Sequence, residues 1–354
     1  MPHKPVRKTM AALVMTVSLG QVAAAQPPAP FVFHNNFWVN LHQALYADAG
    51  RTARAGEAGR VGQEVAAGRA TGAGTADQAG RGDRTGGLDR SGWSAADLAA
   101  WRAALDAYAD LARRDQVFDA TLVAVNDALG RAPTVDTLTD AAIDPAIRAA
   151  LNQAAPVYRL RVWPRQRPIN DAWIADMKPR VDRHGAALTR ALAHAYHTAW
   201  PSAPILIDVS GDAGPFGAYT TNAGPAGFAA HATMSPAGRG AEGEMALETI
   251  FHEASHAVDA SIMRMIAAEC AVQKVAAPQN LWHALIFYTT GELVRRQVGM
   301  VGDEHYMPYA YRFDVYGRGM EHERAALEQH WQPWLDGKVT VEAALRNLVR
   351  DTTR

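Results

Sequence analysis

The hydrophobic period of this 354-residue chain changes near Pro204, and this change constrains the fold more than any other feature. Before it, residues 93–203 place apolar side chains at the spacing of amphipathic helices. After it come three short strand-like runs separated by Gly and Pro turns, over residues 205–209, 218–222 and 228–235. A long helical pattern without Pro or internal Gly then covers residues 245–266. The sequence therefore predicts an α+β protein that is mostly helical.

The first 25 residues have the three-part layout of a secretory signal peptide. Basic residues precede the apolar run Met10–Leu19, and Ala23-Ala24-Ala25 offers small residues for a cut before Gln26. The apolar run is too short to span a membrane. We therefore expect an exported protein, periplasmic or secreted, that is cut after Ala25 and keeps no stable membrane anchor. An uncut N-terminal anchor is the alternative.

Four further segments follow the signal peptide. Residues 26–49 are predicted to hold an N-terminal amphipathic helix, because Phe33, Phe37, Leu41 and Leu45 lie four apart. Residues 50–92 are rich in Gly, Ala and Arg with few large apolar residues, which predicts a disordered insertion. Residues 93–203 form a helical scaffold region without recognisable chemistry. Residues 204–354 form the predicted catalytic region.

Composition excludes several classes of partner and site. The net charge of −1 gives no electrostatic reason to expect nucleic acid as a partner. A single cysteine, Cys270, excludes a disulfide framework and any metal site built from several cysteines.

Residues 252–256 read His-Glu-Ala-Ser-His and carry the clearest chemical pattern. Helical residues four apart share one face, so His252 and His256 can both reach one metal ion. Glu253 points about 100° away from His252, where its carboxylate can hydrogen-bond a metal-bound water without displacing it. The pattern predicts one Zn²⁺ per chain, with Glu253 as the general base for attack of water on a carbonyl. Two solvated histidines on a surface helix are the alternative.

With strands before this motif, residues 204–312 resemble the zinc metallopeptidases called zincins. The resemblance implies a zincin-like core, in which a short mixed sheet has its edge strand beside the HExxH helix. In that arrangement the edge strand binds the backbone of a peptide or protein substrate by strand addition.

The third zinc ligand decides the subclass of zincin. Metzincins place a Gly and a His after the motif where this chain has Asp259 and Ile262, which excludes that subclass. Gluzincins take a Glu from a following helix, and here Glu292 lies on a helix predicted over residues 279–298. A carboxylate facing a core is costly unless it is paired or bound to metal, so we expect Glu292 to be the third ligand. A buried ion pair of Glu292 with Arg295 or Arg296 is the alternative.

Three other residues near the motif have two interpretations each. Asp259 suits a carboxylate that orients a ligand imidazole, and it is next in line as third ligand; a helix cap or surface position is the alternative. His283 falls on the opposite face of its helix from Glu292, which favours a core or surface role. His231, on the presumed edge strand, either lines the cleft or packs in the core.

The resemblance also implies a donor for the negative charge that develops on the carbonyl oxygen, because gluzincins often supply a Tyr or His after the third-ligand helix. Tyr309 and Tyr311 are the candidates. Pro308 favours an extended backbone, on which residues two apart face the same way. A packed loop is the alternative, and His305 or Arg312 would be the next candidates.

These patterns predict an exported zinc-dependent peptidase of gluzincin type. Two alternatives stay open: a zinc amidohydrolase acting on a cell-wall or other non-protein amide, and a non-catalytic metal-binding scaffold protein. The presence of Glu253 favours an enzyme, because a purely structural metal site needs no base.

Overall fold

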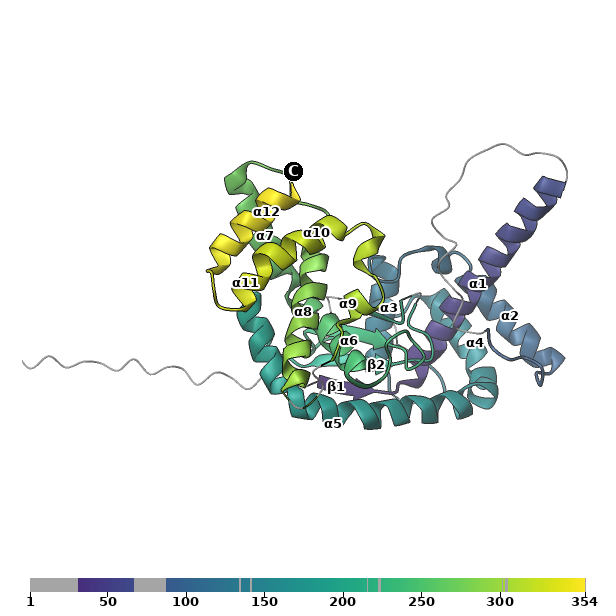
Figure 1. Cartoon of the computed structure of the whole chain (residues 1–354). Coiled ribbons are helices and arrows are strands. Elements are labelled where there is room, and N and C mark those ends of the chain that lie inside the picture. The colour runs from purple at the N-terminus through teal and green to yellow at the C-terminus, as the bar shows by residue number, and fades with distance from the viewer. Residues whose placement is uncertain are drawn as a thin grey trace, which may run out of the picture.

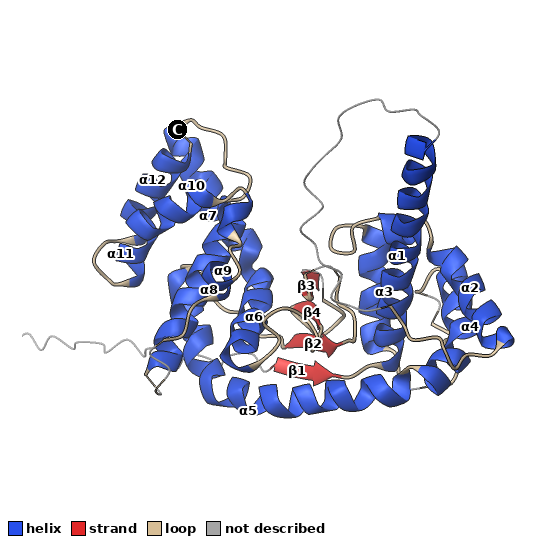
Figure 2. Cartoon of the chain, turned by 45° about the vertical axis from the view of Figure 1, so that its right-hand side comes forward, coloured by secondary structure: helices blue, strands red, loops and turns tan. Residues whose placement is uncertain are grey.

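A small mixed sheet lies at the centre of the molecule, between two groups of helices (Figures 1 and 2). The computed structural model describes residues 31–66, 87–133, 135–140, 142–214, 216–221, 224–300, 302 and 305–353. The four strands are β1 (Phe31–His34), β2 (Ile205–Val209), β3 (Ala218–Thr221) and β4 (Ala230–Met234). Their order is β1-β2-β4-β3, with β3 antiparallel to β4 and the other pairs parallel. The described part of the chain is therefore α+β and mostly helical, as predicted.

The helices fall on either side of the sheet, and α5 runs beneath it from one group to the other (Figure 2). The N-terminal group is α1 (Phe37–Ala66), α2 (Ala95–Tyr108), α3 (Ala120–Arg131) and α4 (Pro145–Arg161), followed by the long α5 (Trp163–Ala195). The C-terminal group is α6 (Gly243–Ser255), α7 (Asp259–Gln273), α8 (Leu281–Gly299), α9 (Tyr309–Arg312), α10 (Glu321–Ala326), α11 (Gln332–Leu335) and α12 (Val341–Thr352).

Each group has its own hydrophobic core. The N-terminal core packs α1 to α4 around large buried side chains such as Trp38, Trp101 and Tyr158. The second core packs α5 to α8 and the C-terminal helices against the sheet, around Phe251 and Trp331. Because burial of apolar surface is the main stabilising contribution, the sheet and α6 are held mainly by this second core.

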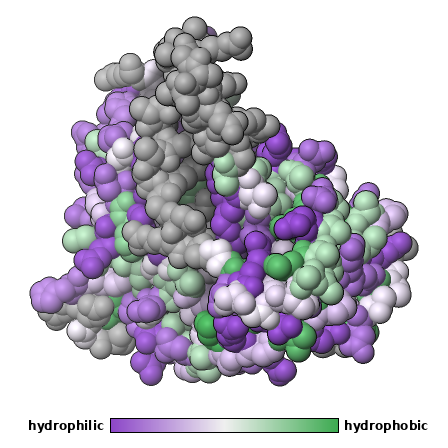
Figure 3. Space-filling view, turned by 90° about the vertical axis from the view of Figure 1, so that its right-hand side faces the viewer, coloured by the Kyte–Doolittle hydropathy of each residue, from purple (hydrophilic) through white to green (hydrophobic). Residues whose placement is uncertain are grey.

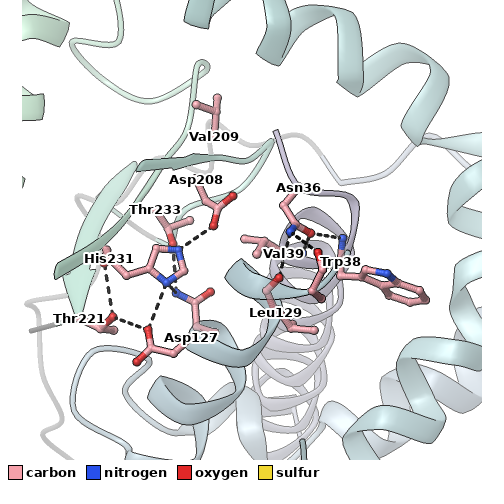
Figure 4. Close-up of polar contacts among 12 residues, drawn as sticks. Asn36, Trp38, Val39, Asp127, Leu129, Asp208, Val209, Thr221, His231 and Thr233 are labelled. Carbon is pink, nitrogen blue, oxygen red and sulfur yellow. Dashed lines mark hydrogen bonds and ion pairs between the residues drawn. The ribbon is translucent and has the colours of Figure 1, made fainter. Parts of the chain in front are cut away.

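Buried polar contacts join the N-terminal helices to the sheet. His231 of β4 lies between two carboxylates, with Nε2 at 2.8 Å from Asp208 of β2 and Nδ1 at 3.2 Å from Asp127 of α3 (Figure 4). Gly130 permits this approach of α3, because a Cβ there would lie 2.9 Å from the His231 ring. His231 therefore sits on an inner strand, buried between α3 and the sheet, and not on the edge strand; its role is in packing.

The start of the described chain differs from its prediction. Residues 31–34 form β1, and the helix begins only at Phe37, where the Asn36 side chain accepts hydrogen bonds from the backbone N–H groups of Trp38 and Val39. Asn36 is a helix-capping residue and so marks the start of the helix, but the four-residue spacing of Phe33 and Phe37 runs across this boundary. At its other end α1 continues to Ala66, so the predicted disorder over residues 50–92 is wrong for residues 50–66. The predicted signal peptide at residues 1–25 lies outside the described residues.

The three strands after residue 204 are confirmed within a residue or two. The helical pattern over residues 245–266 is interrupted, however. The backbone forms a short 3₁₀ helix at His256–Val258, which separates α6 from α7. In the part of the chain that the structure describes, no helix has the length and apolar character needed to cross a membrane. On the face shown in Figure 3, hydrophilic residues alternate with smaller hydrophobic areas.

Candidate metal centre

His252 and His256 lie at the C-terminal end of α6, as the motif predicts. Their ring centroids are 5.2 Å apart and their planes are nearly perpendicular, so the two imidazoles lie in contact with each other. His252 lies within the last turn of α6, whereas His256 begins the 3₁₀ helix that follows.

A third histidine completes the group. His283 stands in the first turn of α8, which packs against α6, and its Nε2 lies 3.3 Å from Nε2 of His252. The His283 ring centroid is 5.3 Å from that of His252 and 5.4 Å from that of His256. One nitrogen from each ring lies within 4.8 Å of the others, so the three residues can hold a metal ion. The structure thus gives His283 a possible metal-binding position that differs from the core or surface role predicted for it.

The donor set suits a transition metal. Two nitrogens at tetrahedral positions about 2.0–2.1 Å from a zinc ion stand about 3.3 Å apart, which matches the His252–His283 pair. Burial and the neighbouring histidines lower the pKa of His252 well below 6.5, and burial lowers the pKa of His283 to about 3. Both rings are therefore neutral near pH 7, and neutral imidazole is the form that binds metal.

Aromatic rings and one carboxylate hold the histidines in place. Phe287 stacks on His252 with centroids 4.0 Å apart, and Trp282 stacks on His283 at 5.0 Å. Asp259 is buried, and its carboxylate lies 3.8 Å from Nδ1 of His256. This position agrees with the predicted orienting role of Asp259.

Glu292 is not part of this group. Its carboxylate accepts hydrogen bonds of 2.7–2.8 Å from the guanidinium groups of Arg295 and Arg296, one turn further along α8. These two arginines lower the pKa of Glu292 against the opposing effect of burial. His283, and not Glu292, therefore lies with the two motif histidines, and the alternative of an ion pair describes Glu292 correctly. The reason is the orientation of α8, which turns the face of His283 and Phe287 toward α6.

Glu253 is buried beside the histidines and contacts the edge strand. Its Oε2 accepts a 2.7 Å hydrogen bond from the Thr220 hydroxyl of β3, and the same hydroxyl bonds the Glu253 backbone carbonyl. Burial raises the pKa of Glu253, while His256 and the Thr220 hydrogen bond lower it. A carboxylate of raised pKa next to three possible ligands is suited to accept and return a proton.

The two predicted tyrosines lie on different sides of α9. Tyr309 faces the site: its ring is parallel to that of Phe287, with centroids 6.5 Å apart. Tyr311 donates a 2.7 Å hydrogen bond to Glu328 and packs on Tyr316. Residues 309–312 are helical, and residues two apart on a helix point in nearly opposite directions. The expectation that both tyrosines face the site is therefore wrong for Tyr311.

A buried carboxylate fixes the segment that carries Tyr309. Glu248, one turn before His252 on α6, accepts hydrogen bonds from the Tyr309 backbone N–H at 2.9 Å and the Tyr306 hydroxyl at 2.6 Å. Burial raises the pKa of Glu248 to about 7 against the effect of these hydrogen bonds. Glu248 is not among the residues predicted for the site, although its place one turn before His252 puts it on the same face of the helix.

Comparisons with known protein families, with curated proteins and with solved structures gave no match for this chain.

Proposed function

We propose that this protein is a zinc-dependent hydrolase of peptide bonds, with His252, His256 and His283 as metal ligands and Glu253 as general base. The observation that carries the proposal is the position of Glu253. Glu253 follows the first of three converging histidines in the chain, and its carboxylate is buried, is close enough to His256 for that residue to lower its pKa, and is held by a hydroxyl of the edge strand. A site that only stored or transported metal would have no use for a buried base at this position.

The proposal keeps the zincin resemblance and changes its ligand set. A His from the following helix takes the place that gluzincins give to Glu. The order β1-β2-β4-β3 puts β3 at the edge of the sheet, and Thr220 joins it to α6. This supports binding of an extended substrate along β3.

Each residue has a distinct part in the proposed reaction. Zinc, when bound, supplies Lewis acidity toward water and the substrate carbonyl. Glu253 accepts a proton from the attacking water and later gives it to the leaving amine. Tyr309 is the proposed donor to the carbonyl oxygen, since its ring faces the site and its hydroxyl has no hydrogen-bond partner among the described residues.

Digestion of a peptide library tests the proposal directly. The purified protein is loaded with zinc and compared with a chelator-treated sample and with the Glu253→Gln variant, and cleavage is followed by mass spectrometry. We expect cleavage only by the zinc-loaded wild-type protein. Cleavage that survives both chelation and the Glu253→Gln change would contradict the proposal. Cleavage of cell-wall amides but not peptides would favour the amidohydrolase alternative.

A further inference from the structure

Arg239 is a half-buried arginine without an acidic partner. It lies in the loop between β4 and α6 and makes no ion pair or hydrogen bond within the described part of the chain. Other arginines near this core do pair, as Arg180 does with Glu244 and Arg296 with Glu292 and Asp336. The guanidinium of Arg239 instead lies over the Phe313 ring, 5.2 Å from its centroid. Its hydrogen-bond donors therefore remain available to a ligand.

A continuous series of ring contacts connects Arg239 with the metal centre. Phe313, beneath the guanidinium, packs edge-on against Tyr309 with centroids 4.7 Å apart. Tyr309 lies parallel to Phe287, which stacks on His252. Gly240, next to Arg239, fits against the Tyr309 ring so closely that a Cβ there would lie 2.9 Å from it. These packed rings fix the position of Arg239 relative to the ligands.

Arg239 also lines a small pocket on the face of α6 that carries the base. Thr249 lines the same pocket and stands one turn before Glu253, and Gly217 at the start of β3 forms another side. Thr220, which holds Glu253, is three residues further along β3, or about 10 Å at the usual rise of a strand. Arg239 lies next to Gly217, because a Cβ at Gly217 would be 3.6 Å from its backbone nitrogen, so a peptide lying along β3 with its scissile bond at Glu253 would pass Arg239 about three residues away.

We propose that Arg239 binds a carboxylate of the substrate, so that the enzyme prefers peptides with a negative charge a few residues from the cleaved bond. Arginine binds carboxylate through two parallel hydrogen bonds, and the aromatic ring below it holds its plane in place. The carboxylate has two possible sources, the C-terminus of the peptide or an Asp or Glu side chain. This inference names a substrate class for the proposed peptidase and therefore rests on that proposed function.

The experiment uses short random-sequence peptides in two forms, with free and with amidated C-termini. We expect the zinc-loaded protein to prefer peptides with a carboxylate at a constant distance from the cut. Loss of this preference on amidation identifies the C-terminus, and loss on replacing Asp or Glu by Asn or Gln identifies a side chain. Equal cleavage of charged and neutral peptides would overturn the inference while leaving the peptidase proposal intact.

Two arginine variants assign the preference to a residue. Arg239→Gln should reduce the ratio of kcat/KM for charged over matched neutral peptides by at least about tenfold, mainly through KM. Arg318→Gln is the control, because Arg318 also contacts residue 313, through its carbonyl, but is exposed. Arg318→Gln should leave the ratio of kcat/KM for charged over neutral peptides unchanged. If Arg318→Gln removes the preference and Arg239→Gln does not, the inference is wrong.

A binding measurement separates the two proposals if the wild-type protein cleaves no peptide. Fluorescently labelled peptides of each matched pair are then titrated into the zinc-loaded wild-type and Arg239→Gln proteins. Tighter binding of the charged peptide that disappears in Arg239→Gln supports the carboxylate site even though the peptidase proposal has failed. Equal affinity of wild type for both members of each pair contradicts it.

Discussion

Nε2 of His283 lies 3.3 Å from Nε2 of His252, although 31 residues separate the two in the sequence. At this distance the two nitrogens either share one hydrogen bond, when one ring carries its proton on Nε2, or present two lone pairs to the same point, when both rings carry the proton on Nδ1. The second arrangement is the one that a shared metal ion requires, because each nitrogen then directs its lone pair to the ion.

The assignment of His283 is tested by a matched pair of variants on α8. His283→Ala should reduce zinc affinity by more than about 100-fold, since loss of a ligand should cost more than the 10–100-fold typical of an outer-shell partner. Glu292→Gln should retain about one zinc per chain, because Glu292 is bound to Arg295 and Arg296. Zinc content and competition with a chelator are measured for both variants. Loss of zinc in Glu292→Gln with full occupancy in His283→Ala would show that Glu292, and not His283, is the third ligand.

The role of Glu253 predicts a separation of binding and turnover. Glu253→Gln preserves the size of the side chain and removes its ability to take a proton. Hydrolysis should therefore fall by at least about 100-fold while zinc content stays unchanged. Zinc analysis and peptide cleavage are measured on the same preparation. Loss of zinc in this variant would mean that Glu253 supports the metal site itself.

The hydrogen bond from Thr220 predicts a change in pH dependence. This bond lowers the pKa of Glu253, so Thr220→Val should raise that pKa further above its ordinary value. A base must be deprotonated to act, so the rate falls as the pH drops through its pKa. The acidic limb of the kcat/KM profile should therefore move to higher pH in Thr220→Val. Thr189→Val is the control, because the Thr189 hydroxyl bonds only the carbonyls of its own helix. An identical limb in Thr220→Val and wild type would exclude Glu253 as the titrating base.

The buried histidine between two carboxylates predicts how stability changes with pH. Burial lowers the pKa of His231, but Asp127 and Asp208 outweigh this effect and raise it from 6.5 to about 9. Between these two values the folded chain binds the proton more tightly than the unfolded chain. His231 therefore makes its full contribution to the free energy of unfolding below about pH 6.5, and this contribution is lost as the pH rises through about 9.

The size of this contribution is on the order of 3 kcal/mol, at about 1.4 kcal/mol per pKa unit. Urea unfolding at a series of pH values measures it. Asp127→Asn removes one of the two charges, so the decline in free energy of unfolding between these pH values should become shallower. An equally steep decline in this variant would show that other groups cause it.

Gly291 predicts a stability difference between two glycines of one helix. A Cβ at Gly291 would lie 2.7 Å from Cβ of Pro308 and 3.0 Å from the Glu248 carboxylate, whereas nothing lies within 4 Å of one at Gly299. Gly291→Ala should thus lower the free energy of unfolding by about 1–3 kcal/mol, despite the better helix propensity of Ala. Gly299→Ala should leave it unchanged or raise it by up to about 1 kcal/mol. Thermal or urea unfolding compares the two, and equal effects would contradict the close packing at Gly291.

The parts of the fold that could be predicted are those set by local spacing. The strands after residue 204 and the pair His252 and His256 depend on residues within a few positions of one another. β1 could not be separated from the helix that follows, because Phe33 continues the four-residue spacing of Phe37 and Leu41. Only the cap at Asn36 marks the boundary, and a single Asn is a weak signal.

The place of His283 in the candidate site could not be predicted because it depends on how α8 is rotated about its axis. His283 and Glu292 lie on opposite faces of α8, and apolar residues 285–288 follow one another around the helix without marking either face. Arg295 and Arg296, three and four residues after Glu292, did carry information, since such neighbours neutralise a carboxylate locally. For Tyr311 the error was one of direction along the chain, because proline restricts the residue before it and leaves those after it free to form α9.

The parallel pairing of β1 with β2 has a consequence for the speed of folding. The two strands are separated by all of α1 to α5, so the sheet cannot close until the two ends of that long segment meet. Contacts between residues so far apart in the chain form slowly, since the loop must first pay its closure entropy. The sheet on which α6 packs should therefore be among the last parts of the protein to become native, and metal binding by the histidines of α6 and α8 should report the completion of folding.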